Sequence, residues 1–216
     1  MINFSISKAV AFFQFSFFFI VNSNLSVCAQ SIKNNFELNG KIYGLNTGMI
    51  YLGYYINKEQ RVINDSSLII NGVFSFKGSI SESAVAFINL SWNGAIGANG
   101  TEIFIEPSVM NVSLQTSKFY EVHLTGSIAQ KECEDLRAIK MSIKEKYKQQ
   151  WNQWTDENFS GNKDSLGTVL TPLFDSLKKA DFTFFLSHPT SYVTAYFLQQ
   201  HISDLPIDSL TFFIAD

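Results

Sequence analysis

Alternation of apolar and polar side chains dominates the first half of the chain after residue 31. In residues 36–42 the two kinds alternate one by one, as in a strand with one buried face. Residues 49–56 are apolar on both faces, which predicts a central strand. Gly, Asn and Ser separate these runs from further strand candidates of the same kind, at residues 61–63, 84–91, 102–107, 109–114 and 120–125.

Residues 66–78 carry the strongest hairpin signal in the chain. Asn71-Gly72 supplies two residues that tolerate positive φ, as a type I′ turn requires, and the strand after the turn then places Phe74 and Phe76 on one face. With this hairpin, the pattern predicts an antiparallel β-sandwich or flattened barrel of about eight strands.

The period of the pattern changes at Gly126. From Ser127 to about Asp156 the apolar residues recur at spacings of three and four, which predicts one long helix with Ser127 as its N-cap. Trp151 and Trp154 lie on the apolar stripe of this helix, where packing against a neighbouring helix and a ligand platform are the alternatives.

Further helical segments follow the long one. A second helix is expected over residues 165–185, with its regular part starting near Pro172 because proline disrupts a helix interior. A third is expected from Pro189 to His201, and a last short segment over residues 207–214. The sequence therefore predicts an α+β chain in which a β domain at residues 30–126 precedes a helical connector region of about three or four helices at residues 127–216.

Residues 1–29 are expected to be a secretory signal peptide. Lys8 precedes an apolar run from residue 9 to 21, and Val27-Cys28-Ala29 places small residues before a cleavage site at Gln30. The run is too short to cross a hydrocarbon core of about 30 Å as a helix. An uncleaved anchor or a buried first strand is one alternative; another is that Leu25 to Cys28 is a lipobox, with Cys28 lipidated. We expect an exported protein of the periplasm or of the outer-membrane-associated cell envelope, with membrane contact only through the signal peptide or a lipid anchor.

Removal of that segment leaves one cysteine, Cys133. One cysteine cannot form an internal disulfide or a C-x-x-C redox site, so the fold must depend on its hydrophobic core. Cys133 lies on the apolar stripe of the first predicted helix. We expect it to be a small buried hydrophobe, with a free reactive thiol as the alternative.

Composition and motifs exclude several classes of function. With 216 residues and a net charge of −3, the chain lacks the basic excess that nucleic-acid binding requires. It has no Walker loop, G-x-S-x-G elbow or H-E-x-x-H motif, and His123, His188 and His201 show no metal-ligand spacing. No catalytic residue, cofactor or metal is predicted. An enzyme would have to use Cys133 as nucleophile with His123 or His188.

Five short stretches, in this order and spacing, carry a family resemblance: Phe36-x-Leu-x-Gly40-x-Ile42, Asp65 to Gly78 around Asn71-Gly72, Phe104-Ile-Glu106-Pro107, Leu124-Thr-Gly126-Ser127 and His188-Pro-Thr-Ser191-Tyr. Over residues 34–214 the chain resembles the N-terminal accessory region of envelope thiol-disulfide oxidoreductases, the domain of unknown function DUF4369. The resemblance implies a signal peptide or lipobox, a β-sandwich, a helical connector and then a thioredoxin-like domain with Trp-Cys-x-x-Cys.

The chain departs from that pattern because it stops where the thioredoxin-like domain would begin. No catalytic residue of the family can be carried over, so we expect a non-catalytic accessory or interaction domain. The chain is then either a stand-alone paralogue or the product of a truncated gene, and its short final helix favours truncation.

Four aromatic residues are candidates for an interaction surface: Tyr51, Tyr54, Tyr55 and Trp92. Tyrosine and tryptophan often anchor interfaces, and core packing is the alternative role for at least two of the four. The expected partners are a second copy of the chain or a thioredoxin-like redox protein. The alternative function is a cell-surface carbohydrate- or peptide-binding sandwich, with Trp92 and the loop from Gly94 to Gly100 as its site.

Overall fold

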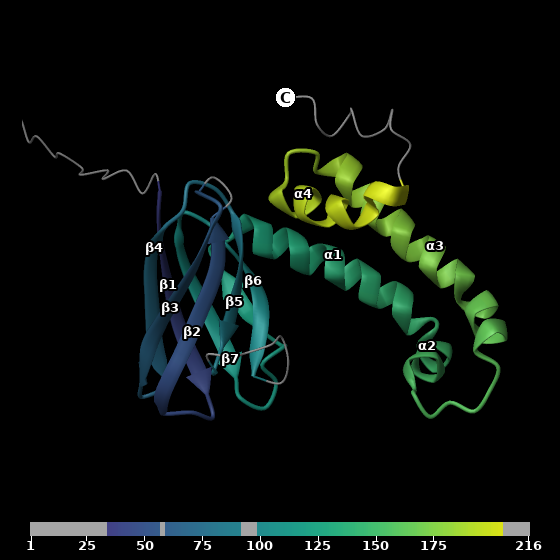
Figure 1. The fold of residues 1–216 in the computed structure, drawn as a ribbon, viewed down its shortest axis with the longest axis horizontal. Coiled ribbons are helices and arrows are strands. Elements are labelled where there is room, and N and C mark those ends of the chain that lie inside the picture. Colours follow the sequence, from purple (N-terminus) through teal and green to yellow (C-terminus); the bar gives the residue numbers. More distant parts are fainter. Residues whose placement is uncertain (1–33, 57–58, 92–98, 205–216) are drawn as a thin grey trace, which may run out of the picture. The chain divides into compact units, whose positions relative to one another are not determined.

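The strands of the barrel form one mixed sheet. The computed structural model describes residues 34–56, 59–91 and 99–204, and within these ranges it has eight strands and four α-helices. The strands are β1 (Asn35–Tyr43), β2 (Thr47–Ile56), β3 (Arg61–Ile70), β4 (Val73–Ser79), β5 (Ala84–Asn89), β6 (Gly100–Ile105), β7 (Val109–Gln115) and β8 (His123–Thr125). Their order, β6-β5-β2-β3-β4-β1-β7-β8, curls into a nearly closed barrel (Figure 1). The predicted α+β class and flattened barrel are confirmed.

One strand pair differs from the antiparallel expectation. β1 and β7 run parallel, with Glu37 opposite Val109 and Tyr43 opposite Gln115. A parallel pair needs a long crossover, and the hairpins from β2 to β6 supply it before the chain returns to the free edge of β1. This pairing bends the sheet into a barrel, because it joins the first strand to the end of the meander.

The predicted hairpin is present. Asn71 and Gly72 have φ values of 53° and 75°, and Ile70 pairs with Val73 across the turn. Its first strand is longer than the sequence predicts, since β3 runs without a break from Arg61 to Ile70. The polar stretch in the middle of β3 stays in the ladder because main-chain hydrogen bonds to β2 do not depend on side-chain polarity.

Alternate side chains of the strands fill the barrel. The core includes side chains with at most 3% exposure from every strand but β8, among them Leu38, Leu52, Ile69, Phe76, Ile88, Ile103 and Met110. Burial of this kind contributes about 25 cal/mol per Å² of apolar surface, and it is the main force that holds the sheet closed.

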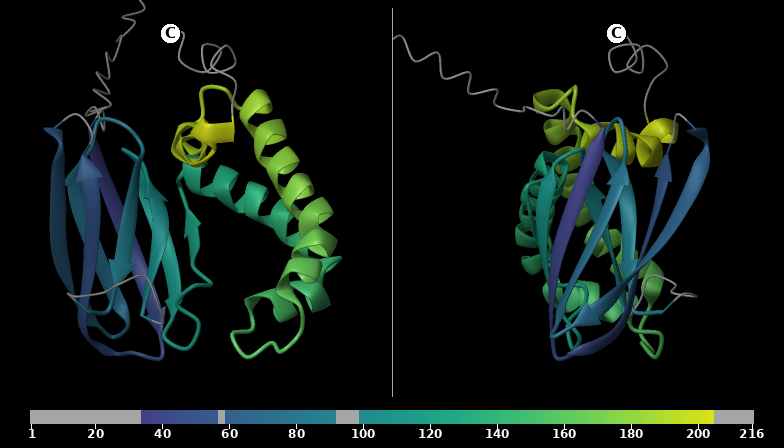
Figure 2. Two further views of the ribbon diagram at one scale, coloured as in Figure 1. Left: turned by 45° about the vertical axis from the view of Figure 1, so that its right-hand side comes forward. Right: turned by 90° about the vertical axis from the view of Figure 1, so that its left-hand side faces the viewer.

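The helices differ from the prediction at one junction. The elements are α1 (Ile128–Glu145), α2 (Lys148–Thr155), α3 (Lys163–Ser187), α4 (Tyr192–Leu198) and the 3-10 helix η2 (Gln199–Asp204). Ser127 caps α1 as predicted, accepting a hydrogen bond from Gln130 N at 3.0 Å. The single long helix that we predicted is wrong, because Tyr147 leaves helical geometry at φ −119° and ψ 19°. Figure 2 shows α3 running back along α1 after this turn.

The break lets the tryptophans of α2 reach α3. Trp151 and Trp154 both make edge contacts with Phe174, and both pack against a buried cluster of Leu166, Leu170 and Leu173. They therefore take the packing role. α3 also passes through Pro172 without ending, so the expected late start of this helix is wrong. Asn162 caps its first turn, and burial of the leucines on both sides of the proline offsets the lost hydrogen bond.

The last α-helix starts later than the sequence predicts. α4 begins at Tyr192 with Ser191 as N-cap, not at Pro189. The predicted signal peptide with Cys28, the side chain of Trp92, and the segment 207–214 lie outside the described residues. Across the ranges that are described, no helix combines the length and apolarity needed to span a bilayer.

Candidate functional site

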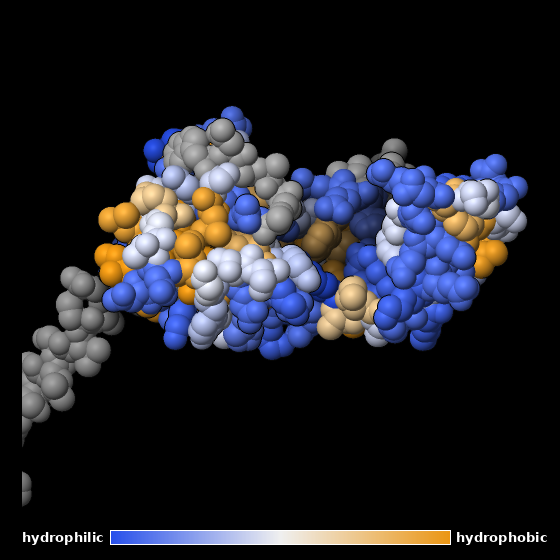
Figure 3. Space-filling view, turned by 90° about the horizontal axis from the view of Figure 1, so that it is seen from below, coloured by the Kyte–Doolittle hydropathy of each residue, from blue (hydrophilic) through white to orange (hydrophobic). Residues whose placement is uncertain are grey.

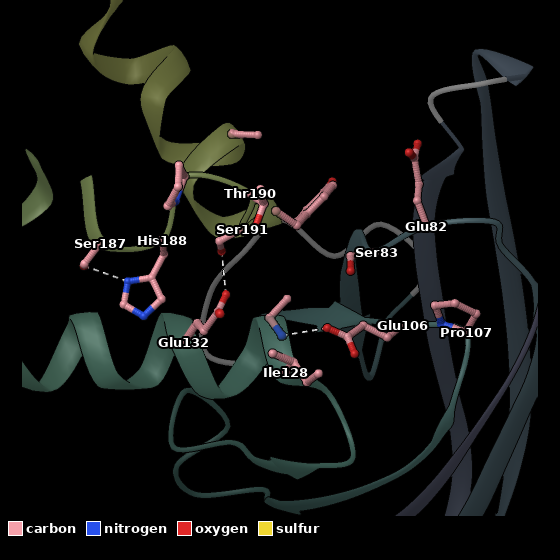
Figure 4. A pocket seen from close by; sticks show the side chains of 14 residues that line it. Glu82, Ser83, Glu106, Pro107, Ile128, Glu132, Ser187, His188, Thr190 and Ser191 are labelled. Atoms are coloured by element: carbon pink, nitrogen blue, oxygen red, sulfur yellow. Dashed lines mark hydrogen bonds between the residues drawn. The ribbon is translucent and has the colours of Figure 1, made fainter. Parts of the chain in front are cut away.

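A hollow of about 840 Å³ lies where the barrel meets the helices (Figure 4). The turn after β6 contributes Glu106 to its lining, α1 contributes Glu132, and the loop between α3 and α4 contributes His188 and Ser191. Glu106, His188 and Ser191 lie in two of the sequence stretches that carry the family resemblance. The stretches are far apart in sequence and meet in this one place.

The polar groups around this hollow hold the barrel to the helices. Glu106 Oε1 accepts a hydrogen bond from Ala129 N at 2.7 Å, in the first turn of α1. Gln130 Oε1 accepts one from Phe104 N at 2.9 Å, on the open edge of β6. Ser191 Oγ donates to Glu132 Oε2 and also caps α4. The first turn of α1 thus covers the gap that the sheet leaves between β6 and β8. The hydrogen bonds in this region fix α1 to the barrel.

The three residues that a cysteine enzyme would use lie in different surroundings. Cys133 is 3% exposed in the cluster between α1 and the other helices, and burial raises the pKa of its thiol. His188 stacks on Phe184 with ring centroids 4.3 Å apart, and His123 is exposed on β8. Among the residues that the structure describes, no group of three or more His, Cys, Asp or Glu is placed to hold a metal ion.

A second hollow, about 430 Å³, lies on the outer face of the barrel. Two of the predicted interaction residues, Tyr51 and Tyr55, point outward from β2 on either side of Gly53. Besides residues of β2, the lining includes residues of β3, β5 and α4: Val62, Asn64, Asp65, Val85, Phe87, Asn89 and Tyr196. We call this site the tyrosine hollow.

Tyr54 takes the core-packing role that the sequence left open. Its side chain is 7% exposed and makes an edge contact with Phe36 inside the barrel, with ring centroids 5.5 Å apart. The structure thus brings together Tyr51 and Tyr55 and separates them from the ring of Tyr54. Sequence reasoning missed Phe87 and Tyr196. The one local signal was Gly53, a glycine that interrupts an otherwise apolar strand.

Tyr196 closes one side of the tyrosine hollow and is fixed by Glu102. Its hydroxyl donates to Glu102 Oε2 at 2.9 Å. Burial, then the hydrogen bond to this carboxylate and its charge, raises the pKa of Tyr196 from 10.0 to about 12. The neutral phenol is therefore favoured in the folded state. The stability that this contributes is complete below pH 10 and is lost as the pH rises toward 12.

We expect Tyr196→Phe to lower the amplitude of the late phase of a tyrosinate absorbance titration, because it removes the tyrosine that titrates near pH 12. Glu102→Gln keeps the phenol but removes the carboxylate, so it should move this phase to lower pH without abolishing it. Burial also raises the pKa of Tyr54, so part of the late phase should remain. A late phase of undiminished amplitude in Tyr196→Phe would contradict the assignment.

An exposed apolar patch lies beside the tyrosine hollow, on the same face of the sheet. Met49 pairs with Leu68, and Ile70 pairs with Val73 across the hairpin. Their exposures are 37%, 64%, 63% and 54% in that order. Figure 3 shows hydrophobic residues gathered on the surface of the barrel. We call these four residues the hairpin patch. Contiguous exposed apolar side chains of this kind commonly mark an interaction site.

Comparisons with known proteins identify one domain. The family model described as "Domain of unknown function (DUF4369)" matches residues 36–133, which include the sheet from Phe36 onward and the start of α1. No curated protein matches the chain. A solved structure titled "Trapped Toxin" matches at 10% identity with a TM-score of 0.21, and the alignment covers 43% of this chain and 23% of that one. Residues 36–133 are thus a DUF4369 domain, as the sequence stretches before residue 134 predict.

Proposed function

We propose that this chain is a non-catalytic interaction domain that pairs with a second copy of itself through the hairpin patch. In this proposal the protein is exported to the periplasm or the outer-membrane-associated envelope, and there it accompanies a thioredoxin-like oxidoreductase. The DUF4369 match supports the accessory role through the resemblance in the sequence. The hairpin patch is the observation that carries the proposal.

The composition of the patch favours a second copy as the occupant. Its four side chains carry no charge, so two copies can meet on a two-fold axis without like charges facing each other, and isologous dimers are the commonest soluble oligomers. The neighbouring surface carries both signs of charge. Lys77 forms an ion pair with Glu37 at 3.2 Å on this side of the sheet, and Lys41 lies opposite Val73. Two such rims related by a two-fold axis can complement each other.

Sedimentation velocity over a range of protein concentrations tests this proposal. We expect the protein to dimerise, and Leu68→Lys to raise the dimer dissociation constant by about 30-fold or more, because it buries a charge at the centre of the interface. Leu68 is 64% exposed, so the same change should leave the unfolding midpoint nearly unchanged.

Leu186→Lys is the matched control, since Leu186 is 61% exposed on α3, outside the patch and its rim. It should leave the dimer intact. A protein that stays monomeric at the highest concentration would overturn pairing with a second copy. Capture of a purified thioredoxin-like protein that Leu68→Lys abolishes would then assign the patch to that partner instead.

A further inference from the structure

Gly53 gives the tyrosine hollow its floor. On β2 it lies between Tyr51 and Tyr55, and across the sheet it lies between Asn64 of β3 and Phe87 of β5. Side chains at these five positions share the outer face of the barrel. The side chains of the other four residues surround Gly53, which has no side chain to fill the space between them.

The backbone at Gly53 does not require glycine. Gly53 is not among the described glycines with positive φ. A Cβ placed on it would meet Asn64 Oδ1 at 3.1 Å, which a small movement of that side chain relieves, and Ile63 O at 3.9 Å. Glycine inside a strand costs roughly 0.5–1 kcal/mol relative to alanine, and it often marks a place where a ligand approaches the backbone closely. Glycine at position 53 therefore lowers the stability of the sheet, and in return it leaves the hollow open.

The lining of the hollow defines the chemistry of a ligand. Aromatic rings of Tyr51, Tyr55 and Phe87 offer flat apolar faces, and the amides of Asn64 and Asn89 offer both hydrogen-bond donors and acceptors. Among the described residues that line it, Asp65 carries the only formal charge, and its Oδ1 accepts a hydrogen bond from Ser66 N at 2.7 Å. An anionic ligand would find no cationic side chain in this lining.

We propose that the tyrosine hollow binds a pyranose ring of a neutral oligosaccharide. The C–H face of such a ring packs on aromatic side chains, and its hydroxyls pair with side-chain amides. Tyr51 and Tyr55 are four residues apart on one strand, so their backbone positions are about 13 Å apart, which leaves room for a sugar ring over Gly53. This site is separate from the hairpin patch, so it extends the function beyond pairing and does not depend on it.

Titration calorimetry and saturation-transfer NMR test this with a panel of neutral oligosaccharides: maltotriose, cellotriose, laminaritriose, mannotriose and diacetylchitobiose. At least one is expected to bind. Gly53→Val should weaken that binding at least tenfold while the unfolding midpoint stays the same or rises, because valine fills the hollow and favours a strand. Tyr55→Ala should weaken it to a similar degree.

Ser75→Val is the matched control, because it adds a β-branched side chain to the exposed face of β4, outside the hollow. It should leave the affinity unchanged, and so should Leu68→Lys in the hairpin patch. Failure of the whole panel to bind overturns the proposal, and so does undiminished affinity in Gly53→Val. Binding of the acidic trigalacturonate alone would also overturn it.

Discussion

Replacement of Gly126 by alanine is expected to lower the free energy of unfolding by about 3 kcal/mol or more. Gly126 has a φ of +89°, in a region that costs other residues about 1–3 kcal/mol. A Cβ at this position would lie 2.3 Å from Val109 O and 3.1 Å from Met110 Cα. Both atoms belong to the backbone of β7, so the strand itself would have to move.

The position of Gly126 explains why relaxation is costly there. It joins β8 to the N-cap of α1, and its carbonyl accepts a hydrogen bond from Ser108 Oγ at 2.7 Å. A shift of β7 would disturb its ladder with β1, and a shift of α1 would break the hydrogen bond from Ala129 N to Glu106. Neither β7 nor α1 can move away from a Cβ at residue 126 without breaking hydrogen bonds elsewhere.

Urea unfolding followed by far-ultraviolet circular dichroism measures the effect. Gly53→Ala is the control, because it makes the same substitution within a strand at a backbone conformation that other residues adopt. It should change the free energy of unfolding by less than about 1 kcal/mol in either direction. If the Gly126→Ala protein unfolds at the same urea concentration as the parent protein, the close approach of β7 to this turn is wrong.

The sequence predicted the features that depend only on residues close together in the chain. The Asn71-Gly72 turn, the inward Phe74 and Phe76 and the N-cap at Ser127 follow from neighbouring residues alone, and each is present. The parallel pairing of β1 with β7 depends instead on which distant strand meets the free edge when the sheet curls, and alternation within a strand carries no information about that.

The sequence pattern did not predict the break between α1 and α2 for a different reason. The apolar stripe continues at three- and four-residue spacing through Tyr147, so a periodic pattern cannot distinguish one helix from two that face the same neighbour. Tyr147, at the break, and Trp151, beyond it, both pack against the leucine cluster of α3, so the same face is buried on both sides of the break.

The tyrosine hollow was predictable only in part. Tyr51 and Tyr55 follow from the sequence of β2, but Phe87, Asn89 and Tyr196 come from elements that only the fold brings beside that strand. Tyr54 lies between the two outward tyrosines in sequence, and alternation alone predicts that it points to the other face. That criterion separates the surface tyrosines from the core tyrosine.

A buried carboxylate on α3 gives the second large expected effect. Asp181 is 3% exposed, both of its oxygens lie 2.8 Å from Lys140 Nζ on α1, and one lies 3.3 Å from His201 Nε2. Loss of Lys140 would leave this carboxylate in the interior, with His201 as its remaining ion-pair partner among the described residues. Removal of one partner from a buried pair typically costs 3–5 kcal/mol, and because Lys140 is itself 30% exposed, we expect Lys140→Met to cost about 2–4 kcal/mol.

Lys148→Met separates the effect of burial from the effect of pairing. Lys148 also forms an ion pair at 2.8 Å, with Glu145, but both side chains are 64% exposed. The same substitution at the same distance should therefore cost less than about 1 kcal/mol in urea unfolding. The double variant Lys140→Met with Asp181→Leu should recover part of the stability lost in Lys140→Met, because no charge is then left unpaired in the interior. Equal losses in Lys140→Met and Lys148→Met would show that Asp181 is hydrated in the folded protein, and that the contact between α1 and α3 depends on apolar packing instead.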